Sequence, residues 1–284
     1  MKTFFPDRIC DYKKKYLIGS GSESQVWCYK KQKKLYALKY NAKDPHLPQH
    51  KNICTVFEIL EYQNHSWTVM EYLGSLSLFE VSTSHRVDKE TCMFWFRQLC
   101  HCLDYVHSFG IAHCDIKCEN IMVHMNTPKL IDWGFSERQD SQNKKGAKGS
   151  FEYCAPEIFG EDAEKRDLFA CDVWSMGVVL HCMLTSCFPF YGRNEEELLQ
   201  CIKEKKSLLK IKDKEEREFF LWLFERKPRK RPTFKQILEH PFVMGQYQSI
   251  PSEKKPEEKK STKKTPLIKK DAVIQPKPKG QVSP

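Results

Sequence analysis

Strand-like and helical patterns occupy different parts of this 284-residue chain. Short runs rich in aromatic and β-branched residues lie between Tyr16 and Tyr40, and CTVFEILEY and WTVMEYL follow. Apolar residues at helical spacing begin with ETCMFWFRQLCHCLDYVHSF (90–109) and recur around 171–185, 194–205, 214–225 and 233–239. Because the strands precede the helices instead of alternating with them, we expect an α+β fold with two lobes.

The C-terminal end has a composition of its own. Residues 251–284 contain ten Lys against three Glu and one Asp, and few large apolar residues. Such a segment buries too little surface to offset its ordering entropy, so we expect a basic disordered tail over residues 245–284. Three interpretations of this tail remain open: a solvated charge run, a nuclear import signal and a segment that docks to an acidic partner. No aromatic residues interleave the lysines, so nucleic-acid binding is not expected.

Cysteine usage and the N-terminus bear on location. The 13 Cys are an odd number scattered singly, and MKTFFPDRIC has no apolar run of signal-peptide length. We therefore expect reduced thiols and a cytoplasmic or nuclear location, or both. The close pairs Cys100/Cys102 and Cys114/Cys118 lack zinc-site spacing. No uninterrupted apolar run approaches the roughly 18 residues that span a bilayer, so no membrane association is expected.

The segment HCDIKCEN (113–120) carries the most specific chemistry. Asp115 can accept a hydrogen bond from an attacking hydroxyl, Lys117 can neutralise a moving phosphoryl group, and Asn120 can bind a metal. About twelve residues later, IDWG offers Asp132, a carboxylate suited to Mg²⁺. The order and spacing favour phosphoryl transfer from ATP over a surface loop with incidental charges.

Two earlier segments suit a nucleotide. In IGSGSESQV (18–26), Gly19 and Gly21 allow a tight turn beside phosphate oxygens, and Val26 can cover a base. In YALK, Ala37 and Lys39 share one strand face, so a small side chain leaves room for adenine beside a cation. Each signal alone is weak, because Gly/Ser turns and exposed strand lysines are common.

From about Tyr16 to Val243 the chain resembles the eukaryotic protein kinase family. The resemblance rests on these loops and on YCAPE (153–157), DVWSMGVVL (172–180), FPF (188–190) and KRPTFKQILEHPF (230–242). HKNICTVFEIL, VMEYL and CEN are most similar to the calcium/calmodulin-dependent and AMP-activated branch. The resemblance implies a bilobal kinase domain over 16–243, with an N-lobe of about 16–72 and a C-lobe of about 73–243. It also implies a serine/threonine kinase that uses ATP and Mg²⁺ on protein substrates.

The resemblance also implies roles for single residues. Asp115 and Lys117 would be catalytic, and Asn120 and Asp132 would bind the metal. Met70 would be the gatekeeper, Glu71 and Leu73 would form the hinge, and Met122 would form the pocket floor. The full implied ATP site is Ile18, Gly19, Ser20, Gly21, Ser22, Glu23, Ser24, Gln25, Val26, Ala37, Lys39, Met70, Glu71, Leu73 and Met122. Structural roles fall to Asp172, which would brace the catalytic loop, and to a buried Glu157–Arg231 pair, while Ser150 would touch the acceptor site.

The largest departure from the family follows Lys39. Family members place a helix there whose Glu pairs with the strand lysine, but NAKDPHLPQHKN (41–52) contains no Glu and two Pro. We expect this helix to be absent or reduced, which gives an N-lobe with one open side. Lys39 then takes another acid as its partner or is positioned by ATP alone. A regulatory protein could pack on the open side.

A second departure concerns regulation. Cys114 replaces the Arg that usually precedes the catalytic Asp, and Gly146 replaces the usual phosphoacceptor Thr. The loop therefore lacks the guanidinium that would clamp a phosphorylated residue. We expect activity that does not depend on activation-segment phosphorylation. The alternative is a pseudokinase, which keeps the fold as a binding scaffold with weak or no catalysis.

Overall fold

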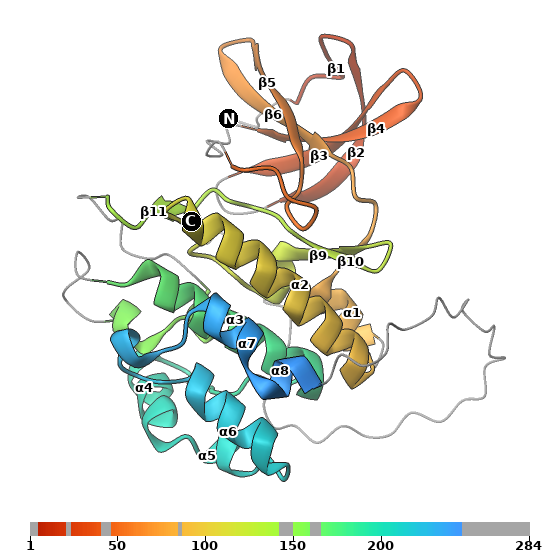
Figure 1. Ribbon diagram of the computed structural model, residues 1–284. Helices are drawn as coiled ribbons and strands as arrows, with labels where there is room; N and C mark the ends of the chain where they lie inside the picture. The colour runs from red at the N-terminus through yellow and green to blue at the C-terminus, as the bar shows by residue number, and fades with distance from the viewer. Residues whose placement is uncertain are drawn as a thin grey trace, which may run out of the picture.

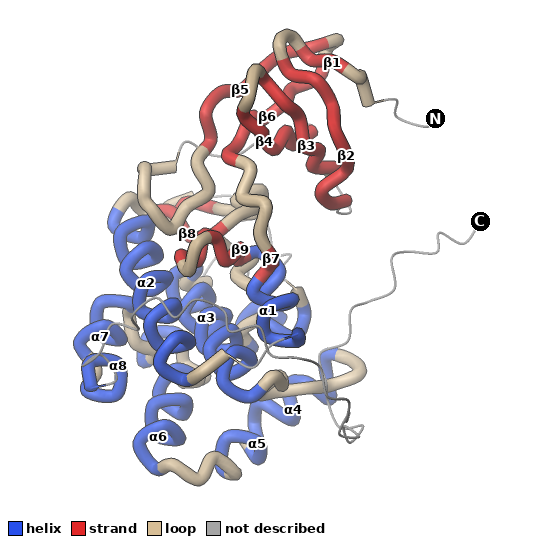
Figure 2. The backbone as a smooth tube through the Cα atoms, turned by 90° about the vertical axis from the view of Figure 1, so that its right-hand side faces the viewer, coloured by secondary structure: helices blue, strands red, loops and turns tan. Residues whose placement is uncertain are grey.

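The computed structural model describes residues 5–20, 24–40, 47–84, 87–141, 150–159 and 166–245. It has a sheet lobe above a helical lobe, and the two meet along the middle of the molecule (Figure 1). The tube view from the side shows the same division of strands and helices (Figure 2). The predictions made for Gly21, Ser22, Glu23, Gly146 and the tail after Gly245 lie outside the described residues.

The N-lobe is one six-stranded antiparallel sheet in the order β1-β2-β3-β4-β6-β5. Its strands are β1 (Arg8–Ile9), β2 (Tyr12–Ser20), β3 (Gln25–Lys31), β4 (Lys34–Tyr40), β5 (Val56–Tyr62) and β6 (His65–Glu71). The sheet therefore begins before the expected N-terminal boundary at Tyr16. Gln63 and Asn64, with φ of 53° and 61°, form the two-residue turn between β5 and β6.

The two faces of this sheet differ. One face buries a cluster of Ile9, Tyr12, Tyr29, Leu38, Trp67 and Val69. Because strand side chains alternate, Ala37 and Lys39 on either side of Leu38 point to the opposite face, toward the C-lobe. The stretch 41–52, where relatives carry a helix, is described from Leu47 onward, and there it forms coil and a turn.

The C-lobe is built on helices. They are α1 (Leu78–Ser84), α2 (Lys89–Ser108), α3 (Leu168–Thr185), α4 (Glu195–Glu204), α5 (Lys206–Leu209), α6 (Lys214–Leu223), α7 (Phe234–Glu239) and α8 (Pro241–Gly245). Asp88 caps α2 by accepting a hydrogen bond from the Thr91 amide, and the helix ends before Gly110, whose φ is 77°. The five predicted helices are confirmed as α2, α3, α4, α6 and α7.

Short elements connect these helices. The strands are β7 (Leu76–Ser77), β8 (Ile111–Ala112), β9 (Ile121–His124), β10 (Thr127–Leu130) and β11 (Glu137–Arg138). Single 3₁₀ turns cover Cys118–Asn120, Phe151–Tyr153, Pro156–Phe159 and Pro228–Lys230. The β9/β10 hairpin lies at the top of the helical lobe, below the N-lobe sheet (Figure 1).

Helix α3 is the central helix of the C-lobe. Its 18 residues are long and apolar enough to cross a membrane by length and composition, a stretch that the sequence analysis did not anticipate because Asp172 interrupts it. Most of the helix is buried, however, and it packs against α2 and α6. It therefore has the character of a core helix, and it carries Asp172 to the catalytic loop.

Candidate active site

The β9/β10 hairpin brings the predicted metal ligands together. Leu130 pairs with Ile121, and the Ile131 amide donates a 2.9 Å hydrogen bond to the Asn120 carbonyl oxygen. Asn120 immediately precedes one strand of the hairpin, and Asp132 follows shortly after the other. Two residues twelve positions apart in the sequence are therefore adjacent in space because of antiparallel pairing.

Asp115 lies at the centre of a hydrogen-bonded network. Its side chain is buried, and its Oδ2 accepts hydrogen bonds from Lys117 Nζ at 2.7 Å and from Asn120 Nδ2 at 2.8 Å. Asn120 Nδ2 also donates to the Asp115 carbonyl oxygen at 2.9 Å. Since the amide nitrogen of Asn120 is engaged by Asp115, the side-chain oxygen is the group that remains for a cation.

Asp172 of α3 holds the catalytic loop from below. Its Oδ1 accepts from the Cys114 amide at 2.9 Å, and its Oδ2 accepts from the His113 amide at 2.8 Å and from His107 Nε2 at 2.9 Å. The Asp172 side chain is 1% exposed, so water could not take its place as the acceptor for these three donors. The predicted bracing role of Asp172 is confirmed.

Two residues beside the catalytic groups have left-handed backbone conformations. Cys114 and Asp132 have φ of 62° and 58°. A non-glycine residue pays a steric penalty of about 1–3 kcal/mol in such a conformation, and such residues concentrate at functional sites. The penalty is offset at Cys114 by the hydrogen bond from its amide to Asp172. Asp132 lines the cleft between the lobes, whereas Asp115 lines a small pocket beside Ser150.

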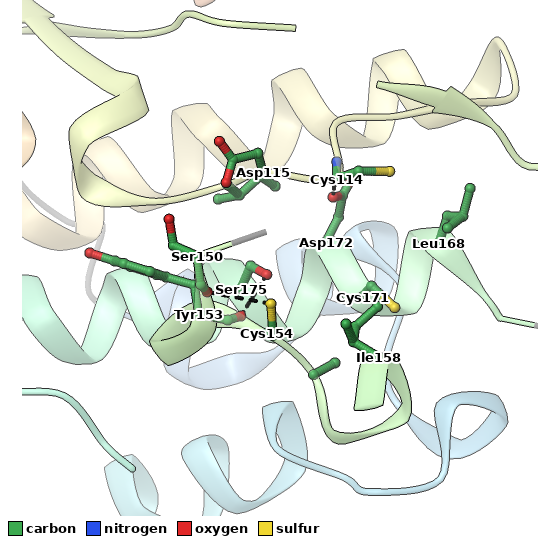
Figure 3. A pocket seen from close by; sticks show the side chains of 12 residues that line it. Cys114, Asp115, Ser150, Tyr153, Cys154, Ile158, Leu168, Cys171, Asp172 and Ser175 are labelled. Atoms are coloured by element: carbon green, nitrogen blue, oxygen red, sulfur yellow. Dashed lines mark hydrogen bonds between the residues drawn. The ribbon is translucent and has the colours of Figure 1, made fainter. Parts of the chain in front are cut away.

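Figure 3 shows the segment that faces the catalytic loop, with Asp115 on one side of a small pocket and Ser150 and Tyr153 on the other. Lys117 Nζ donates to Ser150 Oγ at 3.1 Å, so Lys117 links this segment to Asp115. Tyr153 is held by Ser175 of α3, whose hydroxyl donates to the Tyr153 carbonyl oxygen at 2.8 Å. The pocket has a volume of about 20 Å³, enough for one water molecule.

Lys39 contacts a different acid from the one its relatives use. Its Nζ is 2.7 Å from Asp132 Oδ1, and the Lys39 side chain is buried. Burial opposes the charged form of Asp132, but the Lys39 ammonium and the Gly134 amide outweigh it and lower the pKa of the carboxyl below its usual value. Lys39 therefore contacts the acid that was predicted to bind the metal.

A cleft of about 380 Å³ lies between the lobes, beside these groups. Ten of the predicted residues line it: Ile18, Gly19, Val26, Ala37, Lys39, Met70, Glu71, Leu73, Met122 and Asp132. Ser20, Ser24 and Gln25 do not line it, and Gln25 instead accepts a hydrogen bond from Trp27. Sequence reasoning missed other lining residues, among them Leu47, Cys54, Val56, Tyr72, Ile131 and Trp133.

The cleft fits Mg²⁺ and ATP. A Cβ at Gly19 would meet no protein atom within 4 Å, so the space beside this backbone is left for a ligand. Val26 and Ala37 on the sheet side and Met122 on the opposite side provide apolar surfaces for a flat base. The carboxylate of Asp132 and the amide oxygen of Asn120 are the oxygen donors that Mg²⁺ prefers.

Comparison with known proteins agrees with this geometry. The protein kinase domain family matches residues 12–243. This chain belongs to the protein kinase family. The predicted Glu157–Arg231 ion pair of the kinase domain is confirmed, with Arg231 Nη1 and Nη2 at 2.7 and 3.0 Å from the two carboxylate oxygens.

Relatives of this kinase domain support the branch assigned from its motifs. It is 29% identical over 205 residues to the human SNF-related serine/threonine-protein kinase and 32% identical over 212 residues to calcium-dependent protein kinase 6 of Plasmodium berghei. It is 31% identical over 206 residues to a probable myosin light chain kinase of Dictyostelium discoideum. These alignments cover 70%, 71% and 69% of the chain, but 26%, 14% and 65% of the respective relatives.

Proposed function

We propose that this kinase domain is an active enzyme that transfers the γ-phosphoryl group of ATP to Ser or Thr of protein substrates. One observation carries the proposal: Asp115, Lys117 and Asn120 form a single hydrogen-bonded network with distances of 2.7 and 2.8 Å about the Asp115 carboxylate. A scaffold that only keeps the fold has no chemical need for this network. The human relative, whose name is SNF-related serine/threonine-protein kinase, supports the acceptor class.

The side chains divide the work as follows. The Asp115 carboxylate, whose Oδ2 is engaged by Lys117 and Asn120, accepts the hydrogen bond of the incoming hydroxyl and then its proton through Oδ1. Lys117, which bridges Asp115 and Ser150, stabilises charge on the transferred group. Asn120 and Asp132 would hold Mg²⁺, which would neutralise charge on the phosphates when bound. Lys39, which forms an ion pair with Asp132 in this structure, is placed to contact the α- and β-phosphates when ATP binds.

Ligand binding and turnover can be measured separately. We expect Mg-ATP to raise the melting temperature of the purified chain, and we expect Asp132→Asn to weaken this shift at a given nucleotide concentration, since a metal ligand is lost. The exposed Asp11→Asn variant is the control and should keep the full shift. A full Mg-ATP shift without any phosphoryl transfer would support the pseudokinase alternative instead.

We also propose that activity is independent of activation-segment phosphorylation. Support comes from Cys114, which stands where a cation would be needed to bind a phosphate. Burial, reinforced by the Asp172 carboxylate, raises the pKa of its thiol, so the side chain is neutral. We expect phosphatase-treated protein to keep its initial rate within about twofold, whereas a phosphate-dependent kinase loses the several kcal/mol of charge-assisted contacts that order its segment. Loss of all activity after phosphatase treatment would rule out this part of the proposal.

The expected regulatory protein on the open side of the N-lobe remains a proposal, and we assign it a helix with an apolar face. A groove of about 720 Å³ lies beside β5, lined by Leu47, Lys51 and residues 53–59 among others. Val56, Phe57 and Ile59 of β5 are 40%, 55% and 49% exposed, more apolar surface than an edge strand normally shows. The groove shares Leu47, Cys54 and Val56 with the nucleotide cleft, so an occupant would touch the cleft wall.

A crosslinking experiment tests this proposal. With a photoreactive residue in place of Phe57, we expect an adduct with a partner's helical segment and a changed rate on adding that partner. The same photoreactive residue in place of the exposed Leu209, on the distant end of the C-lobe, is the control. Equal labelling from both positions would contradict the proposal.

A further inference from the structure

A row of cations crosses the outer end of the N-lobe sheet. Arg8 of β1 pairs with Lys13 of β2, Lys13 pairs with Lys30 of β3, and Lys30 pairs with Leu35 of β4. Directly paired residues of antiparallel strands project from the same face, so these four side chains form one line across four adjacent strands. All four residues are exposed. We call Arg8, Lys13 and Lys30 the cation row.

In the described part of the chain, no carboxylate pairs with the cation row, in contrast to the other face of the same strands. There, Lys14 Nζ is 2.8 Å from Asp7 and Lys31 Nζ is 3.6 Å from Asp11. Within the described residues, Arg8, Lys13 and Lys30 form no ion pair. Like charges directly opposite one another destabilise a sheet. The chain therefore maintains a repulsive arrangement that a bound anion would relieve.

The cation row lies on the same face of the sheet as the nucleotide cleft, but toward the other end of the strands. Lys30 shares its strand face with Val26, because strand side chains alternate, and Val26 lines the nucleotide cleft. Lys30 is four positions along the strand from Val26, which corresponds to about 13 Å. A ligand on the cation row would therefore lie beside the nucleotide cleft without occupying it.

The spacing of the row indicates the form of its ligand. Adjacent strands are about 4.8 Å apart, whereas carboxylates on one helix face repeat at about 5–6 Å and those on one face of an extended strand repeat at about 6.6 Å. A helix matches the row more closely. Leu35, 38% exposed, continues the row with an apolar side chain, for which a nucleic-acid backbone offers no counterpart.

We propose that the cation row is a docking surface for an acidic helix of a partner protein, with one carboxylate per turn followed by an apolar residue. The surface is separate from the catalytic groups, so the proposal does not depend on phosphoryl transfer by this chain. It predicts an affinity that falls steeply with salt, since the contacts are exposed charge pairs.

Fluorescence anisotropy on the full chain tests the proposal with a labelled helical peptide that carries three Glu and then a Leu, each one turn apart. We expect Arg8→Gln/Lys13→Gln/Lys30→Gln to weaken binding at least tenfold at low salt. The matched control Lys203→Gln/Lys210→Gln/Lys212→Gln removes three exposed cations of the C-lobe and should change the affinity less than twofold. The double variant Lys13→Gln/Lys30→Gln should show an intermediate loss.

The outcomes separate the alternatives. The row variant should melt at or above the temperature of the wild type, because like-charge repulsion is removed, so weaker binding cannot be ascribed to unfolding. Equal loss in the row and control variants would mean that only net charge matters, and would overturn the proposal. A single-stranded oligothymidylate that binds more tightly than the peptide, and is lost only in the row variant, would also overturn it in favour of nucleic acid.

Discussion

Asp115→Asn is expected to lower the rate of phosphoryl transfer by about a thousandfold, the usual scale for removing a positioned proton acceptor. Asn can keep a hydrogen bond from Lys117 Nζ, now 2.7 Å from Asp115 Oδ2, but it cannot accept the proton of the incoming hydroxyl. The rate of phosphate transfer under saturating Mg-ATP is the measurement. The Mg-ATP melting shift should persist, because Asp115 is not one of the proposed metal ligands.

The control for this variant is Asp11→Asn, which removes an exposed carboxylate that forms a 3.6 Å ion pair with Lys31. It should transfer phosphate within twofold of the wild type, since exposed pairs of this kind contribute little. An Asp115→Asn protein that keeps a tenth or more of the wild-type rate would exclude Asp115 as the proton acceptor.

Asp172→Ala is expected to have the largest effect on stability. It leaves the buried amides of His113 and Cys114 without their acceptor, which now lies at 2.8 and 2.9 Å. Each unpaired buried donor costs about 1–3 kcal/mol, so the melting temperature should fall by on the order of 10 °C. Calorimetry of the purified protein measures this.

Asp172→Asn separates the hydrogen bonds from the volume of the side chain. Its amide oxygen can still accept from one of the two loop amides, so its melting temperature should lie between those of Asp172→Ala and the wild type. The transfer rate of both variants should fall with the loss of loop order. If Asp172→Ala melts within about 2 °C of the wild type, Asp172 does not hold the catalytic loop.

The catalytic groups were predictable because they are close together in the sequence. Asp115, Lys117 and Asn120 occupy one short loop, and their spacing is enough to predict their grouping in space. Asp132 lies further on in the sequence, and the antiparallel pairing of β9 with β10 brings it back to Asn120. For these residues, local pattern and chemistry pointed to the same arrangement.

Other features depend on contacts that no local pattern reports. Lys39 and Asp132 are 93 residues apart, so their contact follows only from how the two lobes meet. Leu47 and Cys54 line the cleft although neither belongs to a helix or strand, so no periodic pattern in the sequence indicated them. The strand β1 is two residues long, too short for an alternating pattern, and the first four residues of β2 also precede Tyr16, where the strand-like runs were expected to begin.

The cation row depends on register in the same way. In the sequence Arg8, Lys13 and Lys30 look like ordinary surface charges among many lysines. Only the pairing of β1, β2 and β3 shows that they stand opposite one another, while Lys14 and Lys31 face acids on the other side. A one-residue shift in register would reverse this assignment.

The most direct test of the account is phosphoryl transfer by the purified chain alone, after phosphatase treatment, with γ-labelled ATP, Mg²⁺ and a generic protein substrate. The account predicts label on Ser and Thr of the substrate, a rate within about twofold of the untreated protein, and about a thousandfold less label with Asp115→Asn. Label no higher than that of Asp115→Asn, from a protein whose melting temperature Mg-ATP still raises, would contradict it and identify the chain as a nucleotide-binding scaffold.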